Sequence, residues 1–331
     1  MKHLQRGAAG SDAICSGTKM GIQLSATPLP VVSLNRIKET ISANLRSTLQ
    51  GDQEMAEIFS GPQGDPGYFG PGSVTWQVHG DLPSMLVGGI ASLLLQSLHP
   101  LAMAGVADHS NYREDPLGRL QRTALFVGTT SFGSTQAADR AIEMVKVIHS
   151  RVVGVGPTGE PYQANDPDLL TWVHVAETAC FLRAYRRFGD RYLPRSAWDK
   201  YFLEMSTVAT KLGAREVPQT FQEVREYFGR VRPSLALTNQ SRDGISYIVN
   251  TTNSTGVEEA LRALIVQAAI GILPGWARDL GQIRQPGSVE GVGVDMAMRS
   301  FGGVLRWALG ESEVLRLATQ RVTGPGVTQA A

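Results

Sequence analysis

Residues 82–100 have the sequence LPSMLVGGIASLLLQSLHP, which is apolar on nearly every side and contains no Asp, Glu, Lys or Arg. A helix that is apolar all round is typical of the buried centre of a helical domain. The stretch at 85–95 has about half of the ~20 apolar residues that a membrane span needs, so we expect a core helix and no membrane span. Helices often end just before proline. We expect this one to end at His99, or to bend at Pro100 into a second short helix over LAMAGVADHS.

Helical signals continue towards the C-terminus. Asp115 with Pro116, and Asp166 with Pro167, each pair an N-cap residue with a proline that fits a first helical turn. Between these two starts, residues 136–153 show the spacing of an amphipathic helix. Its apolar face consists of Ala138, Ile142, Val145, His149 and Val152, and the helix after Pro116 has apolar Leu117, Leu120, Ala124 and Val127 at the same spacing.

The rest of the chain adds helices and no strand pattern long enough for a sheet. Further helices are expected at 33–49, 167–188, 195–212, 216–229, 257–270, 274–284 and 293–319. Non-helical segments are expected at GPQGDPGYFGPGSVTW (61–76), TTSFGST (129–135), GVGPTGEPYQAND (154–166) and SRDGISYIVNTTNSTG (241–256). Residues 1–30 lack periodicity and predict a tail or arm. The sequence therefore predicts an all-α fold, with one helical domain over 31–331.

Composition and motifs exclude several classes of protein. Lys and Arg number 31 and Asp and Glu number 30, so a near-neutral chain without a basic stripe disfavours nucleic-acid binding. The two cysteines, Cys15 and Cys180, show no CxxC spacing, which leaves no argument for a zinc or iron–sulfur site. The first residues contain no apolar signal region, so we expect a cytoplasmic protein. The chain also lacks GxSxG, HExxH and P-loop motifs, and its glycine-rich segments lack the strand–turn–helix setting of a Rossmann site.

Six histidines remain, and five of them lie between His79 and His174. His149 closes the apolar face of the 136–153 helix, so its imidazole is expected to face the core. A buried neutral imidazole needs partners for both ring nitrogens. A metal on one nitrogen and a carbonyl or water on the other would meet that need. For His99 and His109 we expect local hydrogen bonds that fix turns.

His174 lies in the apolar run LLTWVHV, with Glu177 three residues later on the same face of a helix. An HxxE pair of this kind is half of a bundle-type di-iron site. A second HxxE or ExxH would be required, and the sequence contains neither. His174 therefore stays open as a metal ligand or as a catalytic acid or base.

Arg119, Arg122 and Thr123 fall on one side of the helix that starts at Pro116. Two guanidinium groups suit carboxylates through paired hydrogen bonds. A solvated basic edge explains the same spacing. Thr123 is expected to hydrogen-bond either a ligand or a carbonyl of its own helix.

Four segments together resemble a known family. They are FGPGSVTWQVHGD, SLHPLAMAGVADHSNYREDPLGRLQRTALFVGTTSFG, VKVIHSRVVG and LLTWVHVAETACFLRAYRRFG. They are similar to the DUF2236 family, which includes the latex clearing proteins (rubber oxygenases) and the MpaB-type oxygenases. The resemblance covers roughly residues 55 to 285.

This resemblance implies an all-α fold distantly related to the globins, with a pocket for b-type haem and O2-dependent oxidation of an organic substrate. The rubber oxygenases line the haem pocket with an R..KT segment, which here is Arg119, Arg122 and Thr123. Arg122 replaces the lysine, and a guanidinium is a poor iron ligand because it stays protonated. We therefore expect Arg122 and Thr123 to polarise the pocket and Arg119 to bind a haem propionate.

The axial histidine of the family lies in the next helix, which places it on His149, with His174 as the alternative ligand or as an acid–base group. The pocket glutamate of the rubber oxygenases has no counterpart near LAMAGVADHS. The function predicted by the resemblance is a haem b enzyme that uses O2 or peroxide to oxidise a small, largely apolar organic molecule. A haem or apolar-ligand carrier without activity, and a non-haem iron oxidase, are the alternatives. The sequence leaves the oligomeric state open.

Overall fold

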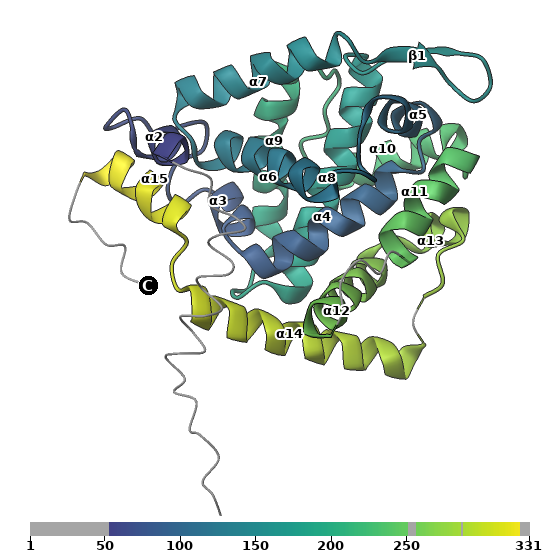
Figure 1. Ribbon diagram of the computed structural model, residues 1–331. Helices are drawn as coiled ribbons and strands as arrows, with labels where there is room; N and C mark the ends of the chain where they lie inside the picture. Colours follow the sequence, from purple (N-terminus) through teal and green to yellow (C-terminus); the bar gives the residue numbers. More distant parts are fainter. Residues whose placement is uncertain (1–52, 251–255, 286, 325–331) are drawn as a thin grey trace, which may run out of the picture.

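The computed structural model describes residues 53–250, 256–285 and 287–324 (Figure 1). In these residues the chain forms fourteen α-helices, one short 3-10 helix and one two-stranded hairpin. The helices of the first half are α2 (Gln53–Ser60), α3 (Val74–His79), α4 (Leu82–Gln96), α5 (Pro100–His109), α6 (Pro116–Phe132), α7 (Thr135–His149) and α8 (Pro167–Phe188). Those of the second half are α9 (Arg195–Leu212), α10 (Phe221–Val231), α11 (Asn239–Asn250), α12 (Val257–Ile272), α13 (Gly275–Gly281), α14 (Ser288–Leu309) and α15 (Glu313–Thr323).

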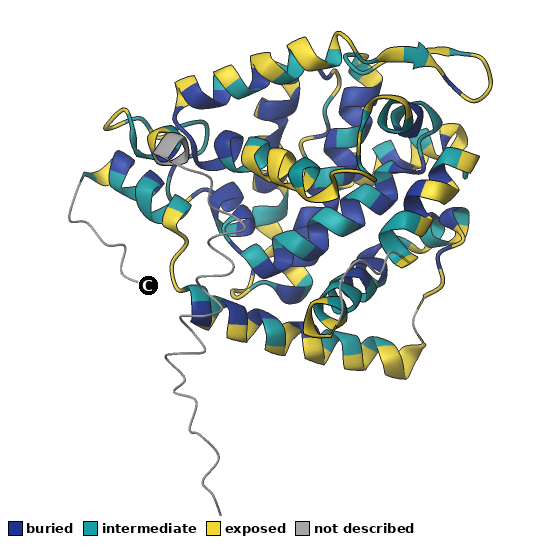
Figure 2. Cartoon of the chain, in the orientation of Figure 1, coloured by how far each residue is buried: buried dark blue, intermediate teal, exposed yellow. Residues whose placement is uncertain are grey.

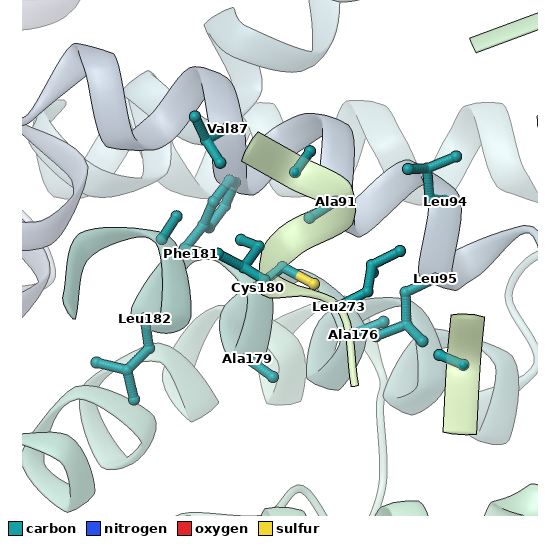
Figure 3. Packing of buried hydrophobic residues seen from close by; sticks show 14 of the residues in the cluster. Val87, Ala91, Leu94, Leu95, Ala176, Ala179, Cys180, Phe181, Leu182 and Leu273 are labelled. Carbon is teal, nitrogen blue, oxygen red and sulfur yellow. The ribbon is translucent and has the colours of Figure 1, made fainter. Parts of the chain in front are cut away.

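The core is built around α4 and α8. Val87, Ala91, Leu94 and Leu95 of α4 pack with Ala176, Cys180 and Phe181 of α8, and Leu273 joins them after α12 (Figure 3). Gly88 allows the close approach of the two helices, because a Cβ atom there would lie 2.7 Å from Cδ1 of Phe181. The central buried helix predicted from residues 82–100 is confirmed, and the fold is a single all-α domain (Figure 2).

Caps fix where the key helices begin. The Asp115 carboxylate accepts a hydrogen bond from Gly118 N at the start of α6, and Asp166 accepts from Asp168 N and Leu169 N at the start of α8. Both capped starts were expected from the Asp-Pro pairs. At Pro100 the chain bends by 106° from α4 into α5, so the second of the two expectations for this position is confirmed.

Several predicted boundaries are wrong. Helix α6 runs through most of TTSFGST and stops only at Gly133, because Thr129–Phe132 are buried and complete its last turn. Helix α7 ends at His149, four residues early, and the polar loop that follows contains strands β1 (Val153–Val155) and β2 (Pro161–Gln163) in an antiparallel pair. Helix α3 begins inside the segment 61–76, where the Ser73 hydroxyl caps it at Trp76 N.

Two further corrections concern the C-terminal half. The polar stretch at 241–256 was expected to be irregular, but α11 covers it up to Asn250 and buries Gly244 and Ile245. The helix expected at 293–319 is two helices, α14 and α15, because the chain turns at Gly310, whose φ of 64° suits glycine.

Two predictions, the tail at 1–30 and the helix at 33–49, lie outside the described residues. Among residues 53–250, 256–285 and 287–324, no single helix is long and apolar enough to cross a membrane. Two bent pairs, α4 with α5 and α12 with α13, reach that length and composition only when taken together. The relation to the globins and the cytoplasmic location stay predictions.

Candidate functional site

The predicted site residues lie on three consecutive helices. Helices α6 and α7 are joined only by Gly133 and Ser134, and α8 follows the β-hairpin. In Figure 1, α7 runs along the top of the molecule while α6 crosses its middle. The predicted site residues lie in the early turns of α6, the last turn of α7 and the first half of α8. The surroundings of these turns show whether the residues can form a site.

The first half of α6 is poorly covered by the rest of the described chain. Leu117, Leu120 and Leu125 are 53%, 48% and 40% exposed, and burial begins only at Thr129 (Figure 2). Large apolar side chains left open side by side are typical of a surface that binds an apolar ligand or partner.

Arg119, Arg122 and Thr123 differ in what they contact. Arg122 is exposed and pairs with the Asp115 carboxylate at 3.2 Å. The Thr123 hydroxyl donates to the Arg119 carbonyl at 3.0 Å, which is the second of its two expected roles. The Arg119 guanidinium lies 5.9 Å from the centre of the Tyr112 ring, and burial lowers its pKa. Arg119 thus lies against an aromatic ring and is partly buried, whereas Arg122 makes an exposed ion pair.

His149 is the last residue of α7 and is half-buried. Ala138 and Ile142 on the same face are buried, so the inward-facing stripe predicted from the sequence is confirmed at these positions. The His149 Nδ1 atom is buried without a hydrogen-bond partner. Burial lowers the pKa of this imidazole, which keeps it neutral and leaves a lone pair on one ring nitrogen.

His174 is only 8% exposed, and no other described residue hydrogen-bonds either of its ring nitrogens. Burial lowers its pKa to about 4. Glu177, one turn later, has no hydrogen-bond partner within the part of the chain that the structure describes, and burial raises its pKa to about 7. Glu177 is only partly exposed to solvent. A neutral imidazole thus lies one turn from a carboxyl group that binds a proton near neutral pH.

A third buried histidine, His79, was not singled out by the sequence. Its Nδ1 lies 2.7 Å from Ser131 Oγ, and its Nε2 lies 2.9 Å from the Tyr201 hydroxyl. Burial, with a smaller effect of His174, lowers its pKa to about 3. Both nitrogens are satisfied, so His79 supports the structure around the site. Its partners are 52 and 122 residues away, a separation that no local pattern reveals.

The predictions for the two remaining described histidines are wrong. His99 makes no capping hydrogen bond, and its ring lies 5.8 Å from that of Trp172. Its Nδ1 is buried without a partner. His109 is exposed and lies 3.0 Å from the distant Val153 carbonyl, on strand β1. The hairpin, absent from the sequence-based prediction, supplies that partner.

A di-iron centre finds no support in the arrangement of side chains. Within the described ranges, no three His, Cys, Asp or Glu residues gather closely enough to hold a metal ion together. His174 and Glu177 therefore lack the second half that a bundle-type site needs. Two shallow hollows, one beside Asp139 and Glu143 and the other beside Tyr68 and Lys211, contain none of the predicted site residues.

Comparison with known proteins gives the family. Residues 76–307, more than half of the chain, match the family model described as "ER-bound oxygenase mpaB/B'/Rubber oxygenase, catalytic domain". No curated protein and no solved structure matched the chain. The matched region begins in α3 and ends in α14, so it includes every helix of the candidate site. The chain belongs to the mpaB/rubber oxygenase catalytic-domain family.

Proposed function

We propose that this oxygenase depends on haem b and uses O2 or peroxide to oxidise a small, largely apolar organic substrate. Family membership supports oxygenase activity. The proposal of haem rests on the family resemblance and on three features of the described residues. These are an unpartnered imidazole at the end of α7, uncovered leucines on α6, and guanidinium groups beside them.

The observation that supports haem most directly is the state of His149. The His149 imidazole is half-buried, burial lowers its pKa and so keeps it neutral, and no described residue hydrogen-bonds its Nε2, which leaves a lone pair for a ligand. His149 would hold the haem iron through the lone pair of its neutral imidazole. Leu117, Leu120 and Leu125 of α6 would cover the faces of an apolar ring system, and Arg119 would pair with a propionate.

When bound, haem supplies the redox chemistry of oxygen activation. The chain supplies positioning and proton control. Arg122 and Thr123 polarise the α6 side of the site, where Arg122 can exchange its exposed pairing with Asp115 for a ligand group. His174, neutral and free of hydrogen bonds, accepts or donates a proton at the wall of the site, and Glu177 one turn away is the next group that can take it up.

The test is a visible absorption spectrum of protein purified from haem-supplied cells. We expect a Soret band in the wild-type protein and in His109→Ala, since His109 is exposed and lies outside the site. His149→Ala should lose haem or shift the Soret band. His174→Ala should keep the band and lose O2-dependent turnover.

Each alternative predicts a different result. Full haem content and an unchanged Soret band in His149→Ala would contradict the proposed ligand, and loss of the band in His174→Ala alone would assign the iron to His174. Iron without a Soret band would indicate a non-haem oxidase. A Soret band without O2-dependent turnover of any apolar substrate in a screen would indicate a carrier.

A further inference from the structure

Three buried side-chain atoms in the described residues have no hydrogen-bond partner: His99 Nδ1, His149 Nδ1 and Asn165 Oδ1. An imidazole Nδ1 can donate a hydrogen bond, and an amide oxygen only accepts. Unsatisfied buried polar atoms are rare, and a complementary donor and acceptor in one region point to each other. The question is which histidine belongs to Asn165.

Asn165 is fastened to the last turn of α7. Its Nδ2 donates to the Lys146 carbonyl at 2.9 Å. That acceptor fixes the orientation of the amide, because only the nitrogen end can donate, and Oδ1 is left as the free acceptor. The residue before Asn165, Ala164, donates its backbone N–H to the Val152 carbonyl at 2.9 Å, just after α7. Residues 164 and 165 are thus both hydrogen-bonded to the end of α7 or to the segment that follows it.

Helix geometry places His149 beside this amide. In an α-helix, the side chains three and four residues after a carbonyl can reach it. For the Lys146 carbonyl these are His149 and Ser150. The Ser150 hydroxyl donates to the Val147 carbonyl instead, at 2.7 Å. His149 is therefore the unpartnered polar side chain of this turn that can reach the amide of Asn165.

His99 has no such link to Asn165. It is connected to this segment only through the charge of Asp166, which partly offsets the effect of burial on its pKa. The Asp166 carboxylate is itself directed to the start of α8, where it accepts from two backbone N–H groups. The His99 ring lies against the Trp172 ring, with 5.8 Å between the ring centres.

The two nitrogens of His149 also differ in exposure. Nδ1 is buried, whereas Nε2, which no described residue hydrogen-bonds, is not among the atoms that are both buried and unpartnered. One nitrogen thus faces the protein and the other faces open space. This is the arrangement of a metal-binding histidine whose second nitrogen is held by an outer partner.

We propose that Asn165 is the positioning residue of His149. The two atoms are not bonded to each other in the structure. A turn of either side chain would let Oδ1 accept a hydrogen bond from His149 Nδ1–H, which would fix the Nδ1–H tautomer and direct the Nε2 lone pair into the site. The consequence for iron binding rests on the proposed haem function. The tautomer itself does not, because it is a property of the protein without haem.

The haem-free protein, labelled with 15N-histidine, tests this directly by long-range proton–nitrogen NMR at pH 7.5. His149→Gln assigns the His149 signals. We expect the Nδ1–H tautomer in the wild-type protein, conversion to the Nε2–H tautomer in Asn165→Leu, and retention of Nδ1–H in Asn165→Asp, which keeps an acceptor oxygen. His109 signals should stay unchanged in all variants, as evidence of an intact fold. With haem added, Asn165→Leu should bind it at least ~10-fold more weakly than Asn165→Asp.

The outcomes separate the two proposals. An Nε2–H tautomer in the wild-type protein, or no change in Asn165→Leu, would overturn the role of Asn165. A response of His99 in place of His149 would also overturn it and assign the amide to His99. If the tautomer changes as expected but no variant binds haem, the contact between Asn165 and His149 stands and the haem function fails.

Discussion

Three buried titratable side chains near α8 make stability depend on pH in opposite ways. His79 and His174 have lowered pKa values, so below pH 6.5 the unfolded chain binds protons that the folded chain does not, and stability falls with acid. Glu177 has a raised pKa of about 7, so its stabilising effect is present below pH 4.5 and is lost as the pH rises towards 7. The molecule should therefore be most stable at mildly acidic pH, as far as these groups decide it.

The variant Glu177→Gln measures how much ionisation of the Glu177 carboxyl group changes the stability of the protein. Glutamine resembles the protonated acid at every pH, so the variant should match the wild type at pH 4.5 and exceed it at pH 8. Each unit of pKa shift corresponds to about 1.4 kcal/mol, and the side chain is not fully covered, so we expect a gain of roughly 1–3 kcal/mol. Urea unfolding at both pH values measures it. The exposed Glu114→Gln is the control and should show no such pH-dependent gain; equal behaviour of the two variants would contradict an enclosed Glu177.

Residue-level prediction from sequence succeeded where the signal is local. Helical spacing alone indicated that His149 shares a face with Ala138 and Ile142, and both of these are buried. It failed for His79, Ser131 and Tyr201, which meet only because three helices pack together. Asn165 was equally hidden, since a polar residue in a loop gives no sign that its amide will hold the end of a helix.

At the level of elements, helix starts were more predictable than helix ends. Asp115 and Asp166 cap α6 and α8 as expected, because the capping contact involves residues only two or three positions away. Helix α11 was missed because its sequence is polar. Its apolar positions, Ile245, Ile248 and Val249, nevertheless follow helical spacing and pack against the core, so a finer search for periodicity would have found it.

Adjacent glycines on α4 offer a matched test of how the two central helices pack. Gly88→Ala would place a methyl group 2.7 Å from Phe181 Cδ1 and 3.0 Å from its Cα, so it should destabilise the protein by about 1–3 kcal/mol. Gly89→Ala meets no atom within 4 Å and should stabilise the helix by about 0.5–1 kcal/mol. Urea unfolding of both variants gives the comparison. A neutral or stabilising Gly88→Ala would mean that α4 and α8 pack less closely than described.

At the scale of the whole molecule, the fold class could be predicted because one stretch is apolar on every side and must be surrounded by other helices. The site could not be predicted in the same way. It depends on how far α6 stands from its neighbours, and the sequence gives no measure of that distance. The leucines of α6 are an example. The helical spacing of Leu117 and Leu120 predicted an ordinary packed face, and in the structure both of them and Leu125 are exposed.

An apolar face of this kind can bind a porphyrin by shape alone, so a thermal-shift experiment should separate iron ligation from apolar binding. A ligand that binds only the folded state at 100 times its dissociation constant stabilises it by about 2.7 kcal/mol, which corresponds to a rise in Tm of ~5 °C for a chain of this size. Haem should produce this rise in the wild-type protein and in His109→Ala. Iron-free protoporphyrin IX at the same concentration should produce a much smaller rise, because it lacks the bond to His149, and His149→Ala should respond equally weakly to both. Equal shifts by haem and protoporphyrin IX in the wild-type protein would show that the uncovered leucines, and not the imidazole, hold the macrocycle.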